Sequence, residues 1–440
     1  MRRRGMRGSG LMKTCFLFLA ACAIPVLRAA TACADVVPGD VIDKTNWEKV
    51  EGLLPGPILE WVKKGDLVLN VGQLEYDQHE YFAPAVKESM KSNLGKYEVN
   101  DQDQIVEVAT GKEPEFIEGF PFPKLDPNDP KAAVKAMYDK HYHTFSYGNI
   151  EYPFHMIWVG RSGFEREIWC VYVNAPLMGF PGAKNTPNPD NIERYTVLAV
   201  RSPFDVAGTA VMLWRYKGDK QDMNFSYLPA IRRVRRMSPS NRSDAFVGSD
   251  CCIDDAWGYD GKINVFEWKL DRVQEALVPT KNPKPERLVK NERGEWVTTA
   301  SVKPSQYGWQ TEGWKGAPWA PTNFVWIKRP VWVIKCKPKD PYYNYGSMEY
   351  WYDPELYFPK YGLIFDRSGA YWKAFLVGHQ AFQSDDGQMK LMIIAIQHMI
   401  DDRTQHSSIV ENYSNRNIWR TFAQMDLNDF SLAGFKKFCK

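Results

Sequence analysis

The feature that most constrains the fold is a series of β-strand patterns that begins at Glu151 and continues to Gln397 of the 440-residue chain. Short apolar runs alternate with turn residues, and turns such as 217–219 and 366–369 separate neighbouring runs at hairpin distance. Hairpins join adjacent strands in antiparallel pairs, so the sequence predicts a mainly β protein with an antiparallel sheet. The predicted strands are His155–Gly160, Glu167–Asn174, Tyr195–Arg201, Gly208–Tyr216, Asp222–Leu228, Ile263–Lys269, Val331–Lys337, Met348–Tyr352, Tyr361–Asp366, Tyr371–Gly378 and Lys390–Gln397.

Several of these strands are apolar on both faces. In the run 208–216, for example, Val211 and Leu213 alternate with the equally apolar Met212 and Trp214. A strand with one face in water alternates apolar and polar residues, so both faces here are either packed core or the wall of an apolar cavity. Methionine and aromatic side chains suit a cavity that accepts flexible apolar ligands. The candidate ligand-binding residues are Met212, Trp214, Tyr216, Met223, Phe225 and Tyr227.

Helices are expected mainly before the strand series. Short helices are predicted over 46–53 and 58–64, and Asp129 with Pro130 marks the start of a helix over 131–140. Residues 35–150 are therefore interpreted as helices and extended segments that pack on a sheet.

The strand-rich part of the chain, residues 151–440, contains one long interruption. Residues 278–322 are rich in Pro, Lys and Trp and lack a clean period. We expect a long excursion packed on the sheet, with either a functional or only a packing role.

The first 34 residues have the pattern of a secretory signal. A basic start precedes an apolar run at 15–27 and the small residues Ala32-Cys33-Ala34. We expect cleavage near Ala34 and a periplasmic mature protein. A lipid anchor on Cys22 is the alternative, but the residues after Cys22 stay apolar, which favours cleavage. Five cysteines would remain, Cys170, Cys251, Cys252, Cys336 and Cys439, and their spacing fits no zinc motif.

A basic cluster follows the run that ends at Leu228. It consists of Arg232, Arg233, Arg235 and Arg236. Guanidinium groups bind phosphate and carboxylate well, so the cluster is a candidate contact for an anionic head group or for a partner. In the alternative interpretation, these arginines pair across a hairpin with the aspartates at 244, 250, 254 and 255.

Evidence for catalysis is weak. The chain contains no GxSxG, no GxxxxGK[ST] and no HExxH motif, and the carboxylates Asp254 and Asp255 would point to opposite faces of a strand. His141 and His143 would offer two ligands to a metal from a strand, but surface or capping roles are favoured. We therefore expect no enzyme activity, no metal and no cofactor. The formal net charge of +3 also gives no reason to expect a nucleic-acid partner.

A set of local motifs resembles a family of bacterial envelope proteins, domain of unknown function 1329, whose members are often labelled outer membrane lipoprotein-sorting proteins. The resemblance covers essentially the whole mature chain. The matching segments are 38–40, 46–47, 50–55, 119–123, 126–130, 227–229, 232–236, 248–250, 254–255, 338–346, 352–353, 359 and 366–369.

The resemblance implies a fold similar to that of the lipoprotein carriers LolA and LolB. In this fold, residues 151–440 would form a strongly curved antiparallel sheet, an incomplete barrel plugged and flanked by helices. The resemblance also implies partners among RND-type exporters and outer-membrane β-barrel proteins. The function we expect is that of a periplasmic carrier or chaperone that binds a lipid, a lipoprotein acyl chain or another amphiphile. A ligand-free adaptor of an exporter or barrel is the alternative, and a hydrolase or lyase acting on envelope glycan is a third.

Overall fold

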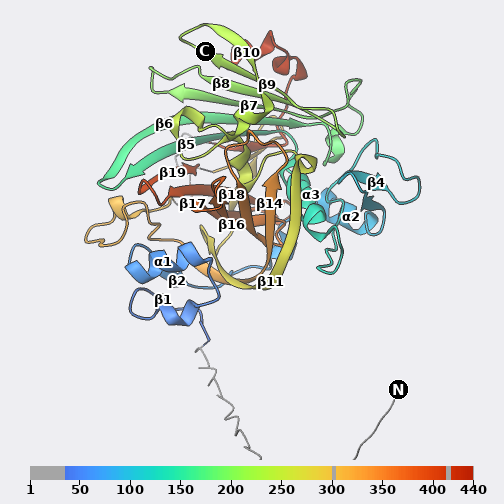
Figure 1. The fold of residues 1–440 in the computed structure, drawn as a ribbon. Coiled ribbons are helices and arrows are strands. Elements are labelled where there is room, and N and C mark those ends of the chain that lie inside the picture. Colours follow the sequence, from blue (N-terminus) through green and yellow to red (C-terminus); the bar gives the residue numbers. More distant parts are fainter. Residues whose placement is uncertain (1–34, 300–303, 413–417, 440) are drawn as a thin grey trace, which may run out of the picture. The chain divides into compact units, whose positions relative to one another are not determined.

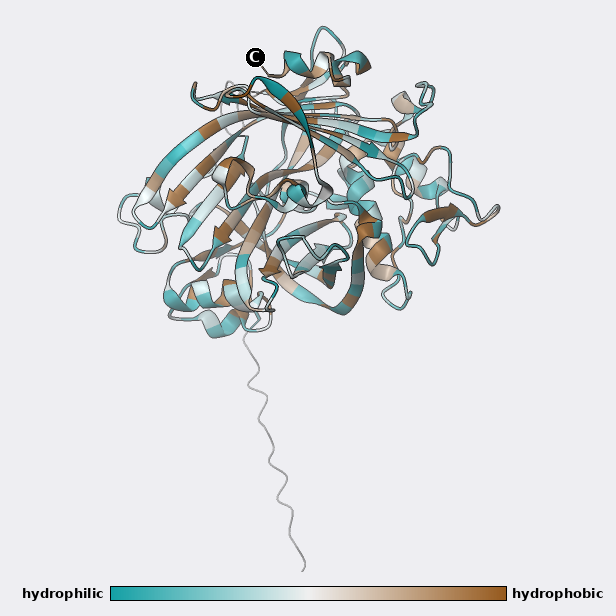
Figure 2. Cartoon of the chain, turned by 45° about the horizontal axis from the view of Figure 1, so that its top comes forward, coloured by the Kyte–Doolittle hydropathy of each residue, from teal (hydrophilic) through white to brown (hydrophobic). Residues whose placement is uncertain are grey.

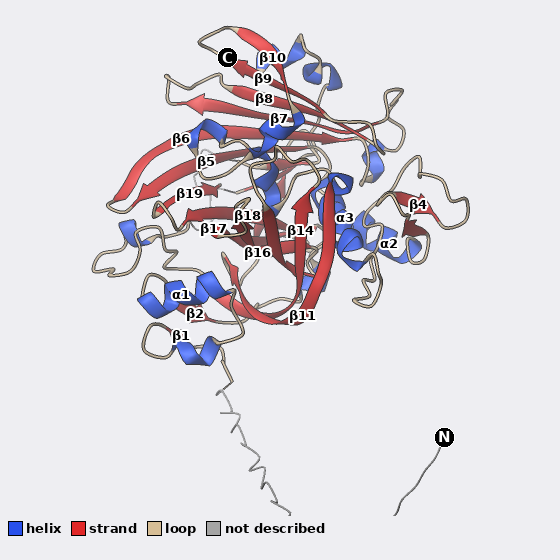
Figure 3. Cartoon of the chain, viewed as in Figure 1, coloured by secondary structure: helices blue, strands red, loops and turns tan. Residues whose placement is uncertain are grey.

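Strands make up most of the regular structure of the computed structural model (Figure 3). The structure describes residues 35–299, 304–412 and 418–439, so the expected signal sequence and Cys22 lie outside the described residues. The long strands are β5 (Ile150–Gly160), β6 (Gly163–Pro176), β7 (Ile192–Ser202), β8 (Ala210–Tyr216), β9 (Met223–Leu228), β10 (Arg233–Met237), β11 (Phe266–Thr280), β14 (Val325–Pro338), β15 (Ser347–Asp353), β16 (Phe358–Phe365), β17 (Tyr371–Ser384), β18 (Lys390–Asp401) and β19 (His406–Glu411).

Two meanders form the main sheet. Strands β5 to β10 pair in chain order, and strands β14 to β19 do the same. Strand β19 pairs with β5 and joins the two meanders, while β11 pairs antiparallel with β14 at the far edge. These long strands curve visibly across the molecule (Figure 1). The expected mainly β fold with a curved antiparallel sheet is confirmed.

Short strands close part of this sheet into a ring. They are β12 (Glu286–Lys290), β13 (Trp296–Thr298) and β20 (Arg420–Thr421). Strand β12 pairs parallel with β17 and antiparallel with β13, which pairs with β20, and β20 pairs with β5. Together with β18 and β19, these pairings give a barrel-like ring of seven strands. Two of the closing strands come from the excursion 278–322, which therefore contributes to the sheet itself.

Helices cover only parts of the sheet. The α-helices are α1 (Gly56–Lys64), α2 (Pro84–Ser92) and α3 (Ala132–Phe145). Helix α3 packs against β11 and β16, and nearly all of its side chains are buried. Hydrophobic residues recur along α3 and along the strands around it (Figure 2). None of the helices in the described part of the chain is long and apolar enough to cross a membrane.

The remaining elements are short. The N-terminal strands β1 (Val41–Ile42) and β2 (Leu69–Val71) pair with each other, and β2 adds in parallel to β14. Strands β3 (Tyr97–Val99) and β4 (Ile105–Glu107) form a separate hairpin. Short 3-10 helices used below are η4 (Pro239–Ser243), η5 (Phe246–Gly248), η6 (Ile253–Gly258), η9 (Leu427–Phe430) and η10 (Gly434–Lys437).

Candidate functional site

An apolar cavity of about 100 Å³ lies against one face of the joined meanders. We call this face of the sheet the inner face. On β5 it is lined by Tyr152, Phe154 and Met156, which alternate along the strand and therefore share one face. Strand β8 contributes Val211 and Leu213 in the same way. Further wall residues are Tyr172, Thr196, Leu198, Met212, Asn224, Ile394, Ala395, Ile396, Gln397 and Val410.

The other wall of the cavity is a single stretch of chain, residues 238–260, which we call the covering segment. It leaves β10 at Met237, passes through η4, η5 and η6, and contributes Phe246 and Trp257 to the cavity wall. The ring of Trp257 packs against Tyr152 and Tyr172, with ring centroids 5.3 and 5.5 Å apart. Aromatic pairs at this separation stabilise the contact beyond the area they bury. The covering segment thus rests on the inner face through its own aromatic side chains.

The cavity has a mouth beside the last strands of the first meander. Six of its wall residues are half-buried and so reach solvent: Leu198, Val211, Met237, Ile253, Ala256 and Val410. Four of these lie on β7, β8, β10 and β19, and two lie on the covering segment. Because five of the six lie on the covering segment or on strands β7, β8 and β10, we place the mouth between the covering segment and the free edge of the sheet.

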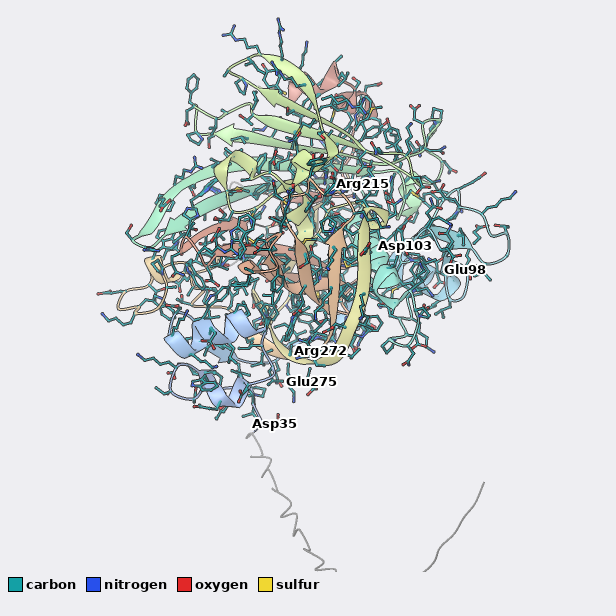
Figure 4. The ribbon with its side chains drawn as sticks, viewed as in Figure 1. Asp35, Glu98, Asp103, Arg215, Arg272 and Glu275 are labelled. Atoms are coloured by element: carbon teal, nitrogen blue, oxygen red, sulfur yellow. The ribbon has the colours of Figure 1, made fainter. Side chains whose placement is uncertain are left out.

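Buried ion pairs hold the covering segment in place. Arg242 donates from Nε to Asp254 Oδ1 at 2.5 Å, which ties η4 to η6. Arg194 on β7 donates from Nη2 to Asp260 Oδ1 at 2.5 Å, which ties the end of the segment to the sheet. Arg215, labelled in Figure 4 near the end of β8, donates to the backbone carbonyl of Asp260 at 2.8 Å. These side chains are almost fully buried.

The charges of this cluster depend on one another. Burial alone would raise the pKa of Asp260, but the guanidinium groups of Arg194, Arg215 and Arg242 lower the pKa of this carboxyl below its usual range. Burial lowers the pKa of the nearby Lys140 to about 7, and Asp260 opposes that effect. The carboxylate of Asp260 thus compensates part of the positive charge that is buried around it.

The backbone of the covering segment is strained at two positions. Val247 has φ 50° and Trp257 has φ 56°, so both non-glycine residues occupy the left-handed region. This conformation is especially costly for a β-branched residue such as valine. Such strain persists only where surrounding contacts enforce it, and it often marks segments with a functional role.

The structure brings the six candidate ligand residues together, but mostly on the face opposite the cavity. Trp214 and Phe225 pack edge to face, with ring centroids 4.9 Å apart, and Trp214 donates from Nε1 to the carbonyl of Phe430 at 2.8 Å. The C-terminal helices η9 and η10 cover this outer face through Phe430 and Phe435. Of the six, Met212 alone also touches the cavity. The other five are Trp214, Tyr216, Met223, Phe225 and Tyr227.

The arginine cluster lies on β10 and the turn before it. All four side chains are exposed, and no ion pair with a carboxylate is found for them among the described residues. The alternative interpretation, pairing with the following aspartates, is wrong because those aspartates have other partners. Asp250 contacts His406, Asp254 contacts Arg242, and Asp255 accepts from Tyr345.

Strand pairing divides the arginines between the two faces. Met237 pairs with Asn224, and both line the cavity. Arg235 pairs with Ser226, so its side chain shares the face of Met237, and Arg233 follows two residues further along that face. Arg236 pairs with Phe225 and shares the outer face. Two arginines therefore extend from the cavity mouth along the inner edge of β10.

The histidines at 141 and 143 do not occupy the surface or capping positions that we favoured. Both lie on α3 rather than on a strand, and both are buried. His141 Nε2 lies 3.2 Å from Glu193 Oε2, while His143 packs face to face with Phe358, with ring centroids 5.3 Å apart. Burial lowers the pKa of His143 to about 3. Residues two apart on a helix point in different directions, so this pair cannot converge on one ion.

The five cysteines among the described residues are free thiols, and four of them are buried: Cys170, Cys251, Cys252 and Cys336. Cys251 and Cys252 line the cavity as part of the covering segment. Burial raises the pKa of both thiols well above the usual range, which makes them unreactive apolar wall residues.

Sequence analysis missed the inner-face residues and the role of the covering segment. The alternate residues Val211 and Leu213 were visible as the second apolar face of the same run. Asp260, Arg194 and Arg242 gave no signal, because they come from distant positions and meet only in the folded chain.

The fold and site define a class of protein with a curved antiparallel sheet and a small apolar cavity under a covering segment. Residues 41–435 match the family model described as Protein of unknown function (DUF1329), and the chain belongs to that family. The resemblance based on the sequence motifs is confirmed. No curated protein matches the chain.

Several solved structures are similar. A domain named for outer membrane lipoprotein sorting, from Vibrio parahaemolyticus, has 16% identity and a TM-score of 0.46, covering 70% of this chain and 100% of that one. A DUF1329 family protein from Desulfovibrio piger has 14% identity and a TM-score of 0.43, covering 68% and 98%. A LolA superfamily protein from Nitrosomonas europaea has 11% identity and a TM-score of 0.39, covering 68% and 98%.

Proposed function

We propose that this protein is a non-enzymatic carrier for an amphiphile, which places its apolar chain between the inner face and the covering segment. The observation that carries the proposal is the apolar cavity itself, whose walls combine sheet residues with methionine and aromatic side chains. Burying an acyl chain there would contribute about 0.8 kcal/mol per methylene. No covalent step is needed for such binding.

The covering segment has to shift for a long chain to enter. A cavity of about 100 Å³ is smaller than the engineered cavity of about 150 Å³ that holds a single benzene molecule, so it is too small for an acyl chain. Residues on both sides of the mouth, such as Val211 and Ile253, are half-buried. Displacement of the covering segment from β8 and β10 would extend the cavity along the inner face. We infer that cargo widens the mouth.

The head group of the cargo would be anionic. Arg235 and Arg233 follow Met237 on the inner face of β10, in steps of about 7 Å, beginning at the cavity mouth. Their guanidinium groups are exposed, and each can form two hydrogen bonds to a phosphate or carboxylate. A lipid or a lipoprotein acyl chain with such a head group satisfies both parts of the site.

The proposed location is the periplasm of a bacterial envelope, where such cargo has to cross water. The signal pattern of the first 34 residues supports this placement. An RND-type exporter and an outer-membrane β-barrel protein are the proposed donor or acceptor partners.

Cargo binding can be tested directly on protein purified from cells without detergent. Native mass spectrometry and organic extraction should detect an anionic amphiphile in near-stoichiometric amount, and the emptied protein should take up radiolabelled palmitic acid. Leu213→Trp fills the cavity from β8 and is expected to reduce uptake more than tenfold. Met223→Trp adds the same ring on the outer face and serves as the matched control.

Head-group recognition can be tested with its own matched pair of variants. Arg235→Gln is expected to weaken binding of phosphatidylglycerol, because the charged inner-face contact is lost. Arg236→Gln changes the neighbouring residue on the outer face and should leave binding unchanged. An empty protein that takes up neither probe would contradict the carrier proposal and would favour an adaptor that holds no ligand.

A further inference from the structure

Two turns lie next to each other at one end of the first meander. The β7–β8 turn, residues 203–209, and the β9–β10 turn, residues 229–232, follow strands that run in the same direction. A Cβ atom built on Gly208 would lie 3.4 Å from Cγ of Pro229, so the two turns are in contact. We call these two turns the basic tip. Figure 1 shows β9 and β10 at the top of the sheet.

The basic tip exposes large apolar side chains. Phe204 is 98% exposed, while Leu228 and Ile231 are 45% and 40% exposed. A single exposed apolar residue is common, but Phe204 and Ile231 on the two adjoining turns, with Leu228 at the end of β9, form a small protruding patch. A fully exposed phenylalanine stabilises nothing within the protein, since it has no neighbour to pack against.

Positive charge adjoins this patch on the side of β10. Arg232 lies in the β9–β10 turn, and Arg233 begins the strand that follows. Arg235 and Arg236 continue along the same edge, and Asp205 is the single carboxylate of the two turns. Charged residues on an edge strand also prevent unwanted strand addition. That role accounts for arginines on β10 but not for Phe204 on the neighbouring turn.

The combination fits the surface of an anionic bilayer. Aromatic and aliphatic side chains enter the region between head groups and acyl chains, while arginine stems extend so that the charged ends contact phosphates. Basic residues near such a surface are attracted by its negative potential. A folded protein partner would instead be expected to require a recessed or flat apolar surface into which shape complementarity is built. Here the apolar residues protrude from turns.

We propose that the basic tip docks the protein onto anionic phospholipid bilayers, with Phe204 and Ile231 entering the interface and Arg232 and Arg233 contacting phosphates. The proposal rests chiefly on Phe204, Ile231 and Arg232, which take no part in the cargo site, whereas Arg233 is shared with the proposed head-group contact. Docking by the β9–β10 turn would also bring the mouth-side arginine Arg235 toward the membrane.

Vesicle flotation of the whole protein purified from cells tests this proposal. Binding is expected to vesicles of phosphatidylcholine with phosphatidylglycerol, to be weak with phosphatidylcholine alone, and to fall with added salt. Phe204→Ser should weaken binding about tenfold, the effect of removing one buried aromatic side chain from the interface. Arg232→Gln and Arg233→Gln should each weaken it about fivefold.

The control variant is Tyr342→Ser, which removes a 76% exposed aromatic residue from the β14–β15 turn. It should float like the parent protein. Phe204→Ser should also keep uptake of palmitic acid, so failure of docking and failure of cargo binding are distinguishable. Equal flotation of the parent protein and Phe204→Ser, or binding that ignores phosphatidylglycerol, would overturn the proposal. Capture of a protein partner through Phe204 without vesicle binding would also overturn it.

Discussion

The carboxylate of Asp260 lies 2.5 Å from the guanidinium Nη2 of Arg194, and both side chains are almost completely buried. This pair joins the last residue of the covering segment to β7, the strand that carries the cavity residues Thr196 and Leu198. The position of the covering segment is thus determined by an ion pair inside the protein as well as by apolar contact. Four predictions follow from this arrangement and from the faces it separates.

Replacement of Asp260 should strongly destabilise the fold. Asp260→Asn keeps the size of the side chain but leaves Arg194, with Arg215 and Arg242 nearby, without this compensating charge. Breaking one partner of a buried pair costs about 3–5 kcal/mol. Chemical denaturation followed by circular dichroism measures this loss.

An exposed ion pair provides the control. Asp385 contacts Arg287 at 2.5 Å, but both side chains are more than half exposed. Asp385→Asn should therefore change the free energy of unfolding by less than about 1 kcal/mol. Equal effects of the two replacements would show that Asp260 does not compensate the buried arginines.

The attachment of the covering segment at Asp250 should depend on pH. His406 Nδ1 lies 2.8 Å from Asp250 Oδ2, its Nε2 lies 3.2 Å from Glu165 Oε2, and the Asp250 hydrogen bond is the main reason why the pKa of His406 is raised. A raised pKa in the folded state means that the charged histidine stabilises the protein. This contribution is complete below the unfolded pKa of about 6.5 and disappears as pH rises through the folded value.

The difference in unfolding free energy between the parent protein and His406→Asn isolates this contribution. The excess unfolding free energy of the parent should be largest in mildly acidic buffer and should shrink as pH rises past neutrality. Ser408, which donates to Asp250 at 2.7 Å, remains in both proteins, and the Lys373 ammonium that donates to the Asp250 carbonyl also remains. A difference that is constant with pH, or that grows in alkali, would show that the histidine does not act through its charge.

Strand patterns allowed most of the sheet to be predicted, but they missed β10 and β19 and underestimated several long strands, β11 most of all. The predicted strand 263–269 is β11, which begins at Phe266 and continues to Thr280. Its middle residues, such as Lys269 and Glu275, are charged, so the apolar pattern ends early. Pairing with β14 along the whole strand holds this polar stretch in the sheet. A long-range partner of this kind is invisible in a local window of sequence.

Which face of β8 lines the cavity could not be predicted from the sequence, for a related reason. Each face is apolar because each is covered, the outer one by residues near Phe430 and the inner one by the covering segment. The two stretches that cover β8 are the covering segment, 238–260, and the C-terminal residues 427–437. No periodicity in β8 indicates which of the two leaves a cavity. Sequence analysis treated the four arginines as one cluster, and only the register of β10 with β9 separates Arg235 from Arg236.

Strain in the covering segment should reverse the usual order of stability of an alanine and a glycine variant. Val247 has φ 50°, a conformation that a residue with a Cβ atom rarely adopts. Val247→Ala and Val247→Gly both remove the valine packing, but only glycine also removes the steric cost of the left-handed backbone. The glycine variant should be the more stable by up to about 1 kcal/mol. If alanine is the more stable, as it is at ordinary helix or strand positions, the segment is not strained at Val247.

The outer face and the cavity should respond differently to truncation. Phe435 is fully buried between η10 and the outer face, where it packs in one cluster with Met212 and Phe225. Phe435→Ala should lower the free energy of unfolding by about 3–5 kcal/mol, because it leaves a void in packed core. It should leave uptake of palmitic acid per folded molecule unchanged, since the cavity lies on the other side of the sheet. Uptake measured beside the denaturation curve separates the two effects.

The opposite result, with cargo lost in Phe435→Ala and retained in Leu213→Trp, would move the ligand to the outer face. The residues first identified in the sequence, Trp214 and Phe225 among them, would then form the binding site, and displacement of the C-terminal helices would open it.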